Sequence, residues 1–193
     1  TEMINLKFEE EDEIRFVVPG KTLSEVIKLL PDQDENVEIL VGRRHIIFKI
    51  EKYSVISRLL EGEFLDYKAA IPAQFTTEVT VNTRNLINSV ERVSLLITDR
   101  LKSPVRCVIG EDTVKLFCTT TMGRATDQIS AEISGDQLEI GFNNKYLLDA
   151  LRAAETDEVR LQLGGPISPM LVLPKEGDAF SFLVLPVRLR SEM

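Results

Sequence analysis

The chain has 193 residues, of which 44% are hydrophobic and 28% charged, and its formal net charge at pH 7 is −8. These proportions are typical of a soluble globular protein with one or two domains. No run approaches the roughly 20 apolar residues of a transmembrane helix. Two cysteines, Cys107 and Cys118, are too few for a disulfide framework, so we expect a reduced, cytoplasmic protein. The negative charge argues against a protein that coats nucleic acid, but not against basic residues gathered on one face.

Three segments share one pattern, in which an alternating strand leads through a turn or cap into an amphipathic helix. The segments are residues 14–30, 79–97 and 138–154. Equivalent leucines mark the repeat, since Leu86 follows Leu23 by 63 residues and Leu147 follows Leu86 by 61. A near-constant period of this size indicates a repeated supersecondary unit.

Apolar spacing predicts the three helices. In the first, Leu23, Val26, Ile27 and Leu30 fall at i, i+3, i+4 and i+7, which places them on one face. Polar side chains near each helix start are candidate N-caps, because their oxygens accept hydrogen bonds from unpaired first-turn amides. The candidates are Thr22, then Thr83 or Asn85, then Asn143 or Asn144.

Three strand-like runs follow each helix, so the unit is predicted to be β-α-β-β-β. The runs are 36–42, 45–51 and 53–60; 105–110, 113–120 and 124–134; and 158–164, 170–174 and 180–189. Residues 3–10 form a further predicted strand with no helix before it. If two units make a domain, residues 71–193 are one complete domain and residues 1–70 are the second half of another. The predicted fold class is α+β.

Enzyme and metal chemistry find little support. The single histidine, His45 in "GRRHII", is better explained as an exposed turn residue than as a catalytic base. One histidine and two separated cysteines are too few for a zinc site. A hydrolase would need a carboxylate pair in a cleft, which the sequence does not indicate. We therefore predict no catalytic residue, no metal and no cofactor.

Basic residues are placed in a similar way on all three helices. Each helix carries two of them seven or eight residues apart, a spacing of about two turns that puts both on one side. The pairs are Lys21 with Lys28, Arg84 with Arg92, and Lys145 with Arg152. A solvated helix face explains any single pair. The same placement in three repeats favours a shared basic surface that faces a polyanion.

Several stretches resemble one family in sequence and in order. They are "FVVPGKTLSEVIKLL", "SRLLEGEFLDYKAAIP", "SPVRCVI", "LEIGFNNKYLLDALRA" and "FLVLPVRL". The chain resembles the bacterial sliding clamp, the beta subunit of the DNA polymerase III holoenzyme. The resemblance implies the DNA clamp fold, with helices lining a central hole and sheets outside. It covers the second half of the middle domain and the whole C-terminal domain.

The resemblance also implies function. The expected protein is a non-catalytic processivity factor that encircles duplex DNA without reading its sequence, in the bacterial cytoplasm at the nucleoid and without a membrane partner. The six basic residues above would face DNA. Full-length protomers would form a head-to-tail homodimer, to which this chain contributes Leu96, Ile97, Arg124 and Asp127.

The C-terminal segment stays apolar as far as Leu189 and holds a proline, Pro186, which suits a sheet edge or a strand end. By resemblance it forms part of a pocket for short peptide motifs of the replicative polymerase, the clamp loader and repair proteins. The implied pocket residues are Leu183, Leu185, Pro186, Val187, Arg188, Asn143, Tyr146, Ile167 and Leu65, the last at a position where the family usually has proline. A peptide-binding repeat module without a DNA function is the alternative, but it has no need of the basic pairs.

Overall fold

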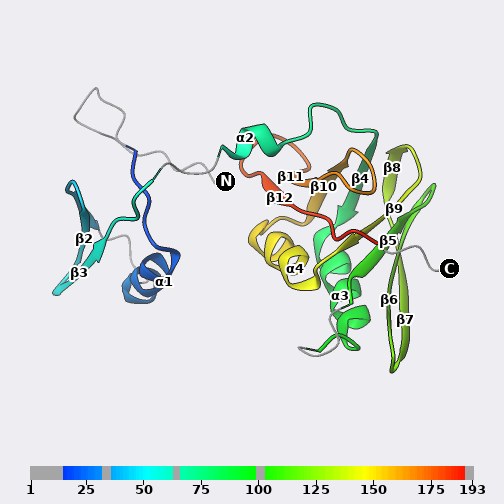
Figure 1. Cartoon of the computed structure of the whole chain (residues 1–193), viewed down its shortest axis with the longest axis horizontal. Coiled ribbons are helices and arrows are strands. Elements are labelled where there is room, and N and C mark those ends of the chain that lie inside the picture. The colour runs from blue at the N-terminus through cyan, green and yellow to red at the C-terminus, as the bar shows by residue number, and fades with distance from the viewer. Residues whose placement is uncertain (1–14, 32–35, 63–65, 99–102, 190–193) are drawn as a thin grey trace. The chain divides into compact units, whose positions relative to one another are not determined.

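The structure is a computed structural model that describes residues 15–31, 36–62, 66–98 and 103–189. The chain divides into two compact units, one within Leu6–Asp66 and one that contains Tyr67–Met193 (Figure 1). Both units combine helices with antiparallel sheets, so the predicted α+β class is confirmed. None of the helices in the described ranges is long and apolar enough to cross a membrane.

The first unit is one helix on a three-stranded sheet. Its elements are α1 (Gly20–Leu29), β1 (Glu38–Val41), β2 (His45–Ile50) and β3 (Tyr53–Arg58), with the strands in the order β1-β2-β3. Alternate residues of β2 point to the helix, so Ile46, Phe48 and Ile50 are buried against Val26. The intervening residues of the strand lie on the opposite face of the sheet.

The predicted apolar face of the first helix is only partly buried. Val26 is in the core, but Leu23 and Leu30 are exposed and Ile27 is 66% exposed. Apolar spacing thus predicted the helix correctly but not its burial, because burial requires a second surface. Among the described residues of this unit, one sheet supplies such a surface.

The described residues of the second unit form two helices of at least ten residues, one short helix and two sheets. Its elements are α2 (Tyr67–Ala70), β4 (Thr77–Asn82), α3 (Thr83–Ser94), β5 (Val105–Ile109), β6 (Thr113–Thr120), β7 (Gly123–Ser130), β8 (Glu132–Gly135), β9 (Leu138–Phe142), α4 (Asn144–Ala153), β10 (Glu158–Leu163), β11 (Met170–Pro174) and β12 (Phe182–Val184). One sheet has the order β12-β11-β10-β4-β8 and the other β7-β6-β5-β9. Helices α3 and α4 pack against each other (Figure 1).

Each sheet of the second unit mixes strands from both repeats. Strand β4 opens one repeat but pairs with β10 of the other, and β9 opens the second repeat but pairs with β5 of the first. Both helices and both sheets therefore contribute to a single hydrophobic core. The two repeats cannot separate without breaking two strand pairings and exposing that core.

Most of the predicted N-cap residues differ from the N-caps in the structure. Asn143 caps α4 as predicted, and its side chain accepts from the amides of Lys145 and Tyr146. The cap of α3 is Asn82, not Thr83 or Asn85, since Asn82 Oδ1 accepts from the Asn85 amide at 3.0 Å. Helix α1 follows Pro19 and has no side-chain cap, so the prediction of Thr22 was wrong. Thr22 lies inside the first turn, where its hydroxyl hydrogen-bonds to that of Ser57.

Three strand predictions also need correction. The run 124–134 divides into β7 and β8, which belong to different sheets. The run 180–189 forms only the short strand β12, and Pro186 then makes an isolated bridge to Phe142. Near residues 14–19, only Val17 makes a bridge, to Leu60. The predicted strand at residues 3–10 lies outside the described ranges. The alternation of apolar residues predicted extended segments here, but it did not predict which sheet each segment would join.

We predict that the two units differ in stability, because the first core has far fewer buried side chains than the second. Amides of β2 should exchange hydrogen faster than those of β10 in the same sample. Phe48→Ala should lower the unfolding free energy of the first unit by about 3–5 kcal/mol, and Leu151→Ala that of the second by about 2–5 kcal/mol. Residue-resolved hydrogen exchange measures both, and equal protection of β2 and β10 would contradict the prediction.

Candidate functional site

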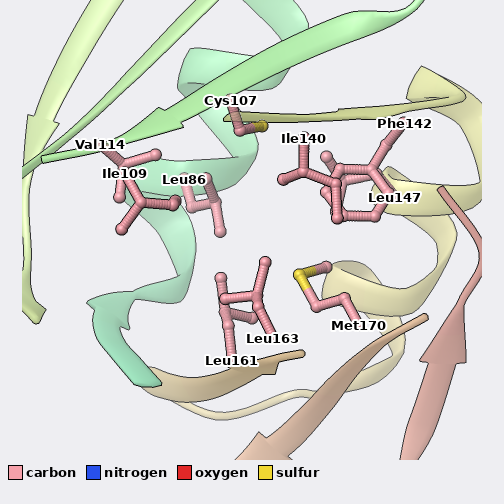
Figure 2. A pocket seen from close by; sticks show the side chains of 10 residues that line it. All are labelled: Leu86, Cys107, Ile109, Val114, Ile140, Phe142, Leu147, Leu161, Leu163 and Met170. Atoms are coloured by element: carbon pink, nitrogen blue, oxygen red, sulfur yellow. The ribbon is translucent and has the colours of Figure 1, made fainter. Parts of the chain in front are cut away.

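The core of the second unit contains a small apolar cavity. Figure 2 shows side chains from both sheets and both helices pointing into it, among them Cys107, Leu147, Leu161 and Met170. Its lining presents no polar atom, and burial raises the pKa of the Cys107 thiol to about 12. A protonated thiol is a poor nucleophile. The cavity is therefore part of the core and has no chemistry to offer a substrate.

The described residues hold no constellation for metal chemistry. No group of three or more His, Cys, Asp or Glu side chains among them is placed to bind a metal ion. His45 is exposed at the start of β2, next to the β1–β2 turn, as predicted. Both cysteines are free and buried.

The C-terminal segment joins the two sheets of the second unit. Strand β12 pairs with β11 at the edge of the five-stranded sheet. The chain then crosses to the edge strand β9 of the other sheet, where the Val187 amide donates to the Gly141 carbonyl at 2.7 Å. Figure 1 shows this crossing in red. A Cβ on Gly141 would lie 2.5 Å from Leu189 Cδ2, so glycine lets the segment approach closely.

This crossing brings several predicted pocket residues into one region. Asn143 directly follows β9 and starts α4, which carries Tyr146 and contacts β12. Met170 is paired with Val184, so the loop with Ile167 lies beyond the same end of the strand pair as Leu185. Tyr146, Ile167 and Leu185 are 63–67% exposed, and Val187 is also exposed. Exposed apolar side chains gathered in this way are typical of a binding surface.

The other predicted pocket residues have different surroundings. Leu183 is half-buried opposite Leu171, Pro186 is half-buried at its bridge to Phe142, and Arg188 is exposed. The Asn143 side-chain oxygen already caps α4, which leaves its NH₂ group to meet a ligand. Leu65 lies outside the described residues.

The first basic residue of each predicted pair occupies the same place in its helix. Lys21, Arg84 and Lys145 are the second residues of α1, α3 and α4, and all three are exposed. None of them forms an ion pair with any part of the chain that the structure describes. None of these helices has an acidic residue in its first turn. Three helix N-termini therefore present an unneutralised cation.

The second basic residue of each pair is neutralised by an acid. Lys28 pairs with Glu25 at 2.8 Å within α1, Arg92 pairs with Asp127 of β7, and Arg152 of α4 pairs with Glu91 of α3 at 2.7 Å. Glu91 and Arg152 are 61 residues apart, the spacing of Leu86 and Leu147, so they hold equivalent repeat positions. The two members of each pair therefore differ in their surroundings, since the second has an acidic partner and the first has none among the described residues.

The residues predicted for the dimer interface lie around the end of α3 and strand β7. Helix α3 packs on β7, and Arg92 Nε donates to Asp127 Oδ2 at 2.9 Å. Leu96 and Ile97 follow α3, and Arg124 of β7 stacks over the Phe117 ring at 4.4 Å. Strand β7 is an edge strand of its sheet, so one side of its backbone is open to pairing.

Comparisons with known proteins decide the family. A model of the C-terminal domain of the DNA polymerase III beta subunit matches residues 68–188, and a model of the central domain matches residues 1–66. The chain belongs to the DNA polymerase III beta subunit family. It is 32% identical over 186 residues to the beta sliding clamp of Staphylococcus epidermidis, a match that covers 95% of this chain and 49% of that protein.

Solved structures of this family have the same fold. The DNA polymerase sliding clamp of Bacillus subtilis matches with a TM-score of 0.92 and 31% identity, over 98% of this chain and 50% of that one. A sliding clamp of Bartonella birtlesii, in a structure bound to griselimycin, matches with a TM-score of 0.83 and 30% identity, over 90% of this chain and 47% of that one. The chain spans about half the length of the curated sliding clamps that it matches.

Sequence reasoning missed the acids that neutralise the second basic residues. Glu91 was not among the predicted site residues, although its separation from Arg152 equals the repeat period. Asp127 was assigned only to the dimer interface, and its pairing with Arg92 requires knowledge of how α3 packs on β7. The repeat period could therefore have indicated Glu91 as the partner of Arg152. No local feature of the sequence indicated Asp127 as the partner of Arg92.

We predict that Arg92 lowers the pKa of Asp127 and makes the pair sensitive to acid. Desolvation raises this pKa, but the neighbouring Ser89 hydroxyl, the Arg92 guanidinium and the Gln128 amide together bring it below its usual range. Stability from a lowered carboxyl pKa is present above the unfolded pKa and is lost as pH falls through the folded one. Arg92→Gln should therefore raise the Asp127 pKa, as measured by NMR titration. The same titration in both proteins would show that the guanidinium has no influence.

Proposed function

We propose that this chain is part of a sliding clamp, a non-catalytic processivity factor that surrounds duplex DNA and tethers a polymerase to it. Membership of the beta subunit family supports the proposal. The observation that carries it is the unneutralised cation at the second position of α1, α3 and α4.

A basic residue at a helix N-terminus is unfavourable by itself. The macrodipole makes that end positive, and a like charge in the first turn costs about 0.3–1 kcal/mol. Lys21, Arg84 and Lys145 repeat this arrangement without an acid to offset it. A phosphate next to these positions turns repulsion into attraction, because the dipole and the basic side chain then act on the same anion. Such contacts hold the backbone and do not read bases, which suits a protein that slides.

The domain arrangement follows from the same family. Residues 1–70 form the second half of a middle domain, and residues 71–193 form a C-terminal domain. The exposed Leu23 and Ile27 of α1, and the exposed Leu30 that follows it, support this division, because the equivalent helix α4 is covered by α3. Ring closure occurs head to tail between different surfaces. This chain supplies the surface with Leu96, Ile97, Arg124 and Asp127, next to the open edge of β7.

The exposed apolar residues around the C-terminal segment bind partner peptides. Tyr146, Ile167, Leu185 and Val187 supply apolar contacts, and Asn143 and Arg188 supply polar ones at the rim. The partners are the replicative polymerase, the clamp loader and repair proteins. A peptide-binding module without a DNA function is the second candidate, and this apolar region favours it equally. It leaves the three repeated N-terminal cations unexplained.

We predict that Arg84→Glu weakens DNA binding while it stabilises the fold. The acid complements the macrodipole of α3, so the unfolding free energy should rise by a few tenths to about 1 kcal/mol. Titration of a short duplex at low salt, followed by NMR, should show weaker binding. The log–log salt slope should become smaller by about 0.9 for each phosphate that the variant no longer neutralises. Lys115→Glu makes the same charge change on the outer face of β6 and is the matched control. Equal effects of the two variants would contradict the assignment.

Leu185→Asp tests the peptide surface. Short peptides that end in a leucine–phenylalanine pair should bind the wild-type chain, because two large apolar side chains contribute roughly 1.5–3 kcal/mol each on burial before ordering costs. The substitution places a charge at an exposed position, so the fold should persist while affinity falls at least tenfold. Isothermal titration measures the affinity, and circular dichroism checks the fold. Unchanged affinity in the folded variant would place the peptide elsewhere.

A further inference from the structure

The outer face of the three-stranded sheet carries a row of apolar side chains. Leu40 is paired with Ile47, and Ile47 with Ile56, so the three residues lie side by side across β1, β2 and β3. Ile46 and Phe48, on either side of Ile47, are buried on the α1 side of the sheet. Because side chains alternate along a strand, the row lies on the opposite face.

The row is open to solvent. Leu40 is exposed, Ile56 is 66% exposed and Ile47 is half-buried. The four-stranded sheet also carries a large apolar residue on its outer face, but this residue, Phe117, is only 8% exposed. The guanidinium groups of Arg106 and Arg124 cover its ring, at 5.2 and 4.4 Å from the centroid. Among the described residues, nothing comparable covers the row Leu40–Ile47–Ile56.

A group of basic side chains without a described acidic partner flanks this row on one side. Arg43, Arg44, His45 and Arg58 are exposed there, around the β1–β2 turn and the end of β3. His45 is paired with Arg58, and the Leu59 amide donates to the Arg44 carbonyl at 2.9 Å, which holds the turn beside β3. No described acid pairs with any of the four.

On the other side of the row, the charge is balanced. Lys49 and Glu38 face each other across β1 and β2 and form an ion pair at 3.1 Å. The outer face therefore has three parallel bands, which are neutral, apolar and basic. In a chain of net charge −8, this basic band is a local exception.

We propose that this face docks an acidic amphipathic helix of a partner protein. Strands lie about 4.8 Å apart, so the row is about 10 Å long. Side chains at i, i+4 and i+7 of a helix span a similar length at about 1.5 Å per residue. A helix laid along the row, across the strands, meets the apolar band with these side chains. Carboxylates along one flank of that helix meet Arg43, Arg44 and Arg58.

Charge complementarity and the apolar row together select this partner. A nucleic acid would use the basic band but would gain nothing from Leu40, Ile47 and Ile56. The proposed surface lies in the first unit, whereas the C-terminal peptide surface lies in the second. The proposed surface also includes none of the three cations at the helix N-termini. A test of this surface is therefore independent of the proposed clamp function.

The test uses the whole chain and a capped helical peptide of 14 residues with leucine at i, i+4 and i+7 and glutamate along one flank. Binding is measured by fluorescence anisotropy at low salt. We expect Ile56→Ser to weaken binding at least fivefold. Arg58→Glu should weaken it similarly and reduce its salt dependence. Leu95→Ser removes an apolar side chain that is 81% exposed in the other unit and should change nothing.

Matched probes decide against other ligands. The proposal is overturned if the wild-type chain does not bind the acidic peptide, or if a peptide with lysine in place of glutamate binds as well. It is also overturned if Leu185→Asp abolishes binding while Ile56→Ser does not, since the peptide then occupies the C-terminal surface. Competition by a short DNA duplex that depends on Arg58 but not on Ile56 would assign the basic band to nucleic acid instead. All the substituted side chains are exposed, so the fold should persist.

Discussion

The exchange of opening strands between two repeats is the interaction on which the second unit depends. Because β4 pairs with β10 and β9 with β5, neither repeat can form its sheet alone. The exchange places α3 against α4 and encloses one core between two sheets. It also puts β9 at a sheet edge, where the C-terminal segment can reach it through Val187 and Gly141. The proposed peptide surface is thus a consequence of how the repeats interlock.

In the first unit, the described residues form a single repeat with one helix and one sheet. Its sheet buries one face of β2 against Val26, yet most of the apolar stripe of α1 stays in contact with water. The hydrophobic effect acts on area removed from water, so this stripe contributes little stability until another surface covers it. We therefore expect the repeat in the first unit to be less stable than the two repeats that pack together in the second unit.

Electrostatics separates the basic residues into two groups with different roles. Cations near helix C-termini, such as Arg92 and Arg152, favour the helix dipole and are neutralised by acids that join elements together. The cations at helix N-termini oppose the dipole and have no described partner. Pairs on an exposed surface add little stability, so the first group mainly orients side chains. The second group leaves charge available for an anionic ligand, in an acidic protein that otherwise repels one.

The sequence by itself determined the repeat, the three helices and most of the strands, because period and alternation are local properties of the chain. Gly42 and Gly110 lie at two hairpins, where each donates its amide across the turn, to the carbonyls of His45 and Thr113. Contiguous stretches of the sequence also indicated membership of the beta subunit family. Two caps were misplaced by one to three residues, because apolar spacing locates a helix face better than a helix start.

Only the tertiary structure decided which segments meet. The run 124–134 had one pattern but entered two sheets, since Glu132–Gly135 pairs with β4 while Gly123–Ser130 pairs with β6. Leu185, Tyr146 and Ile167 lie far apart in the chain and gather only because the C-terminal segment crosses between sheets. Packing also decided which cations are paired, because it placed Asp127 next to Arg92 and Glu91 next to Arg152. Local sequence sets what each segment can form, whereas long-range pairing and packing set its neighbours, and a binding surface is made of neighbours.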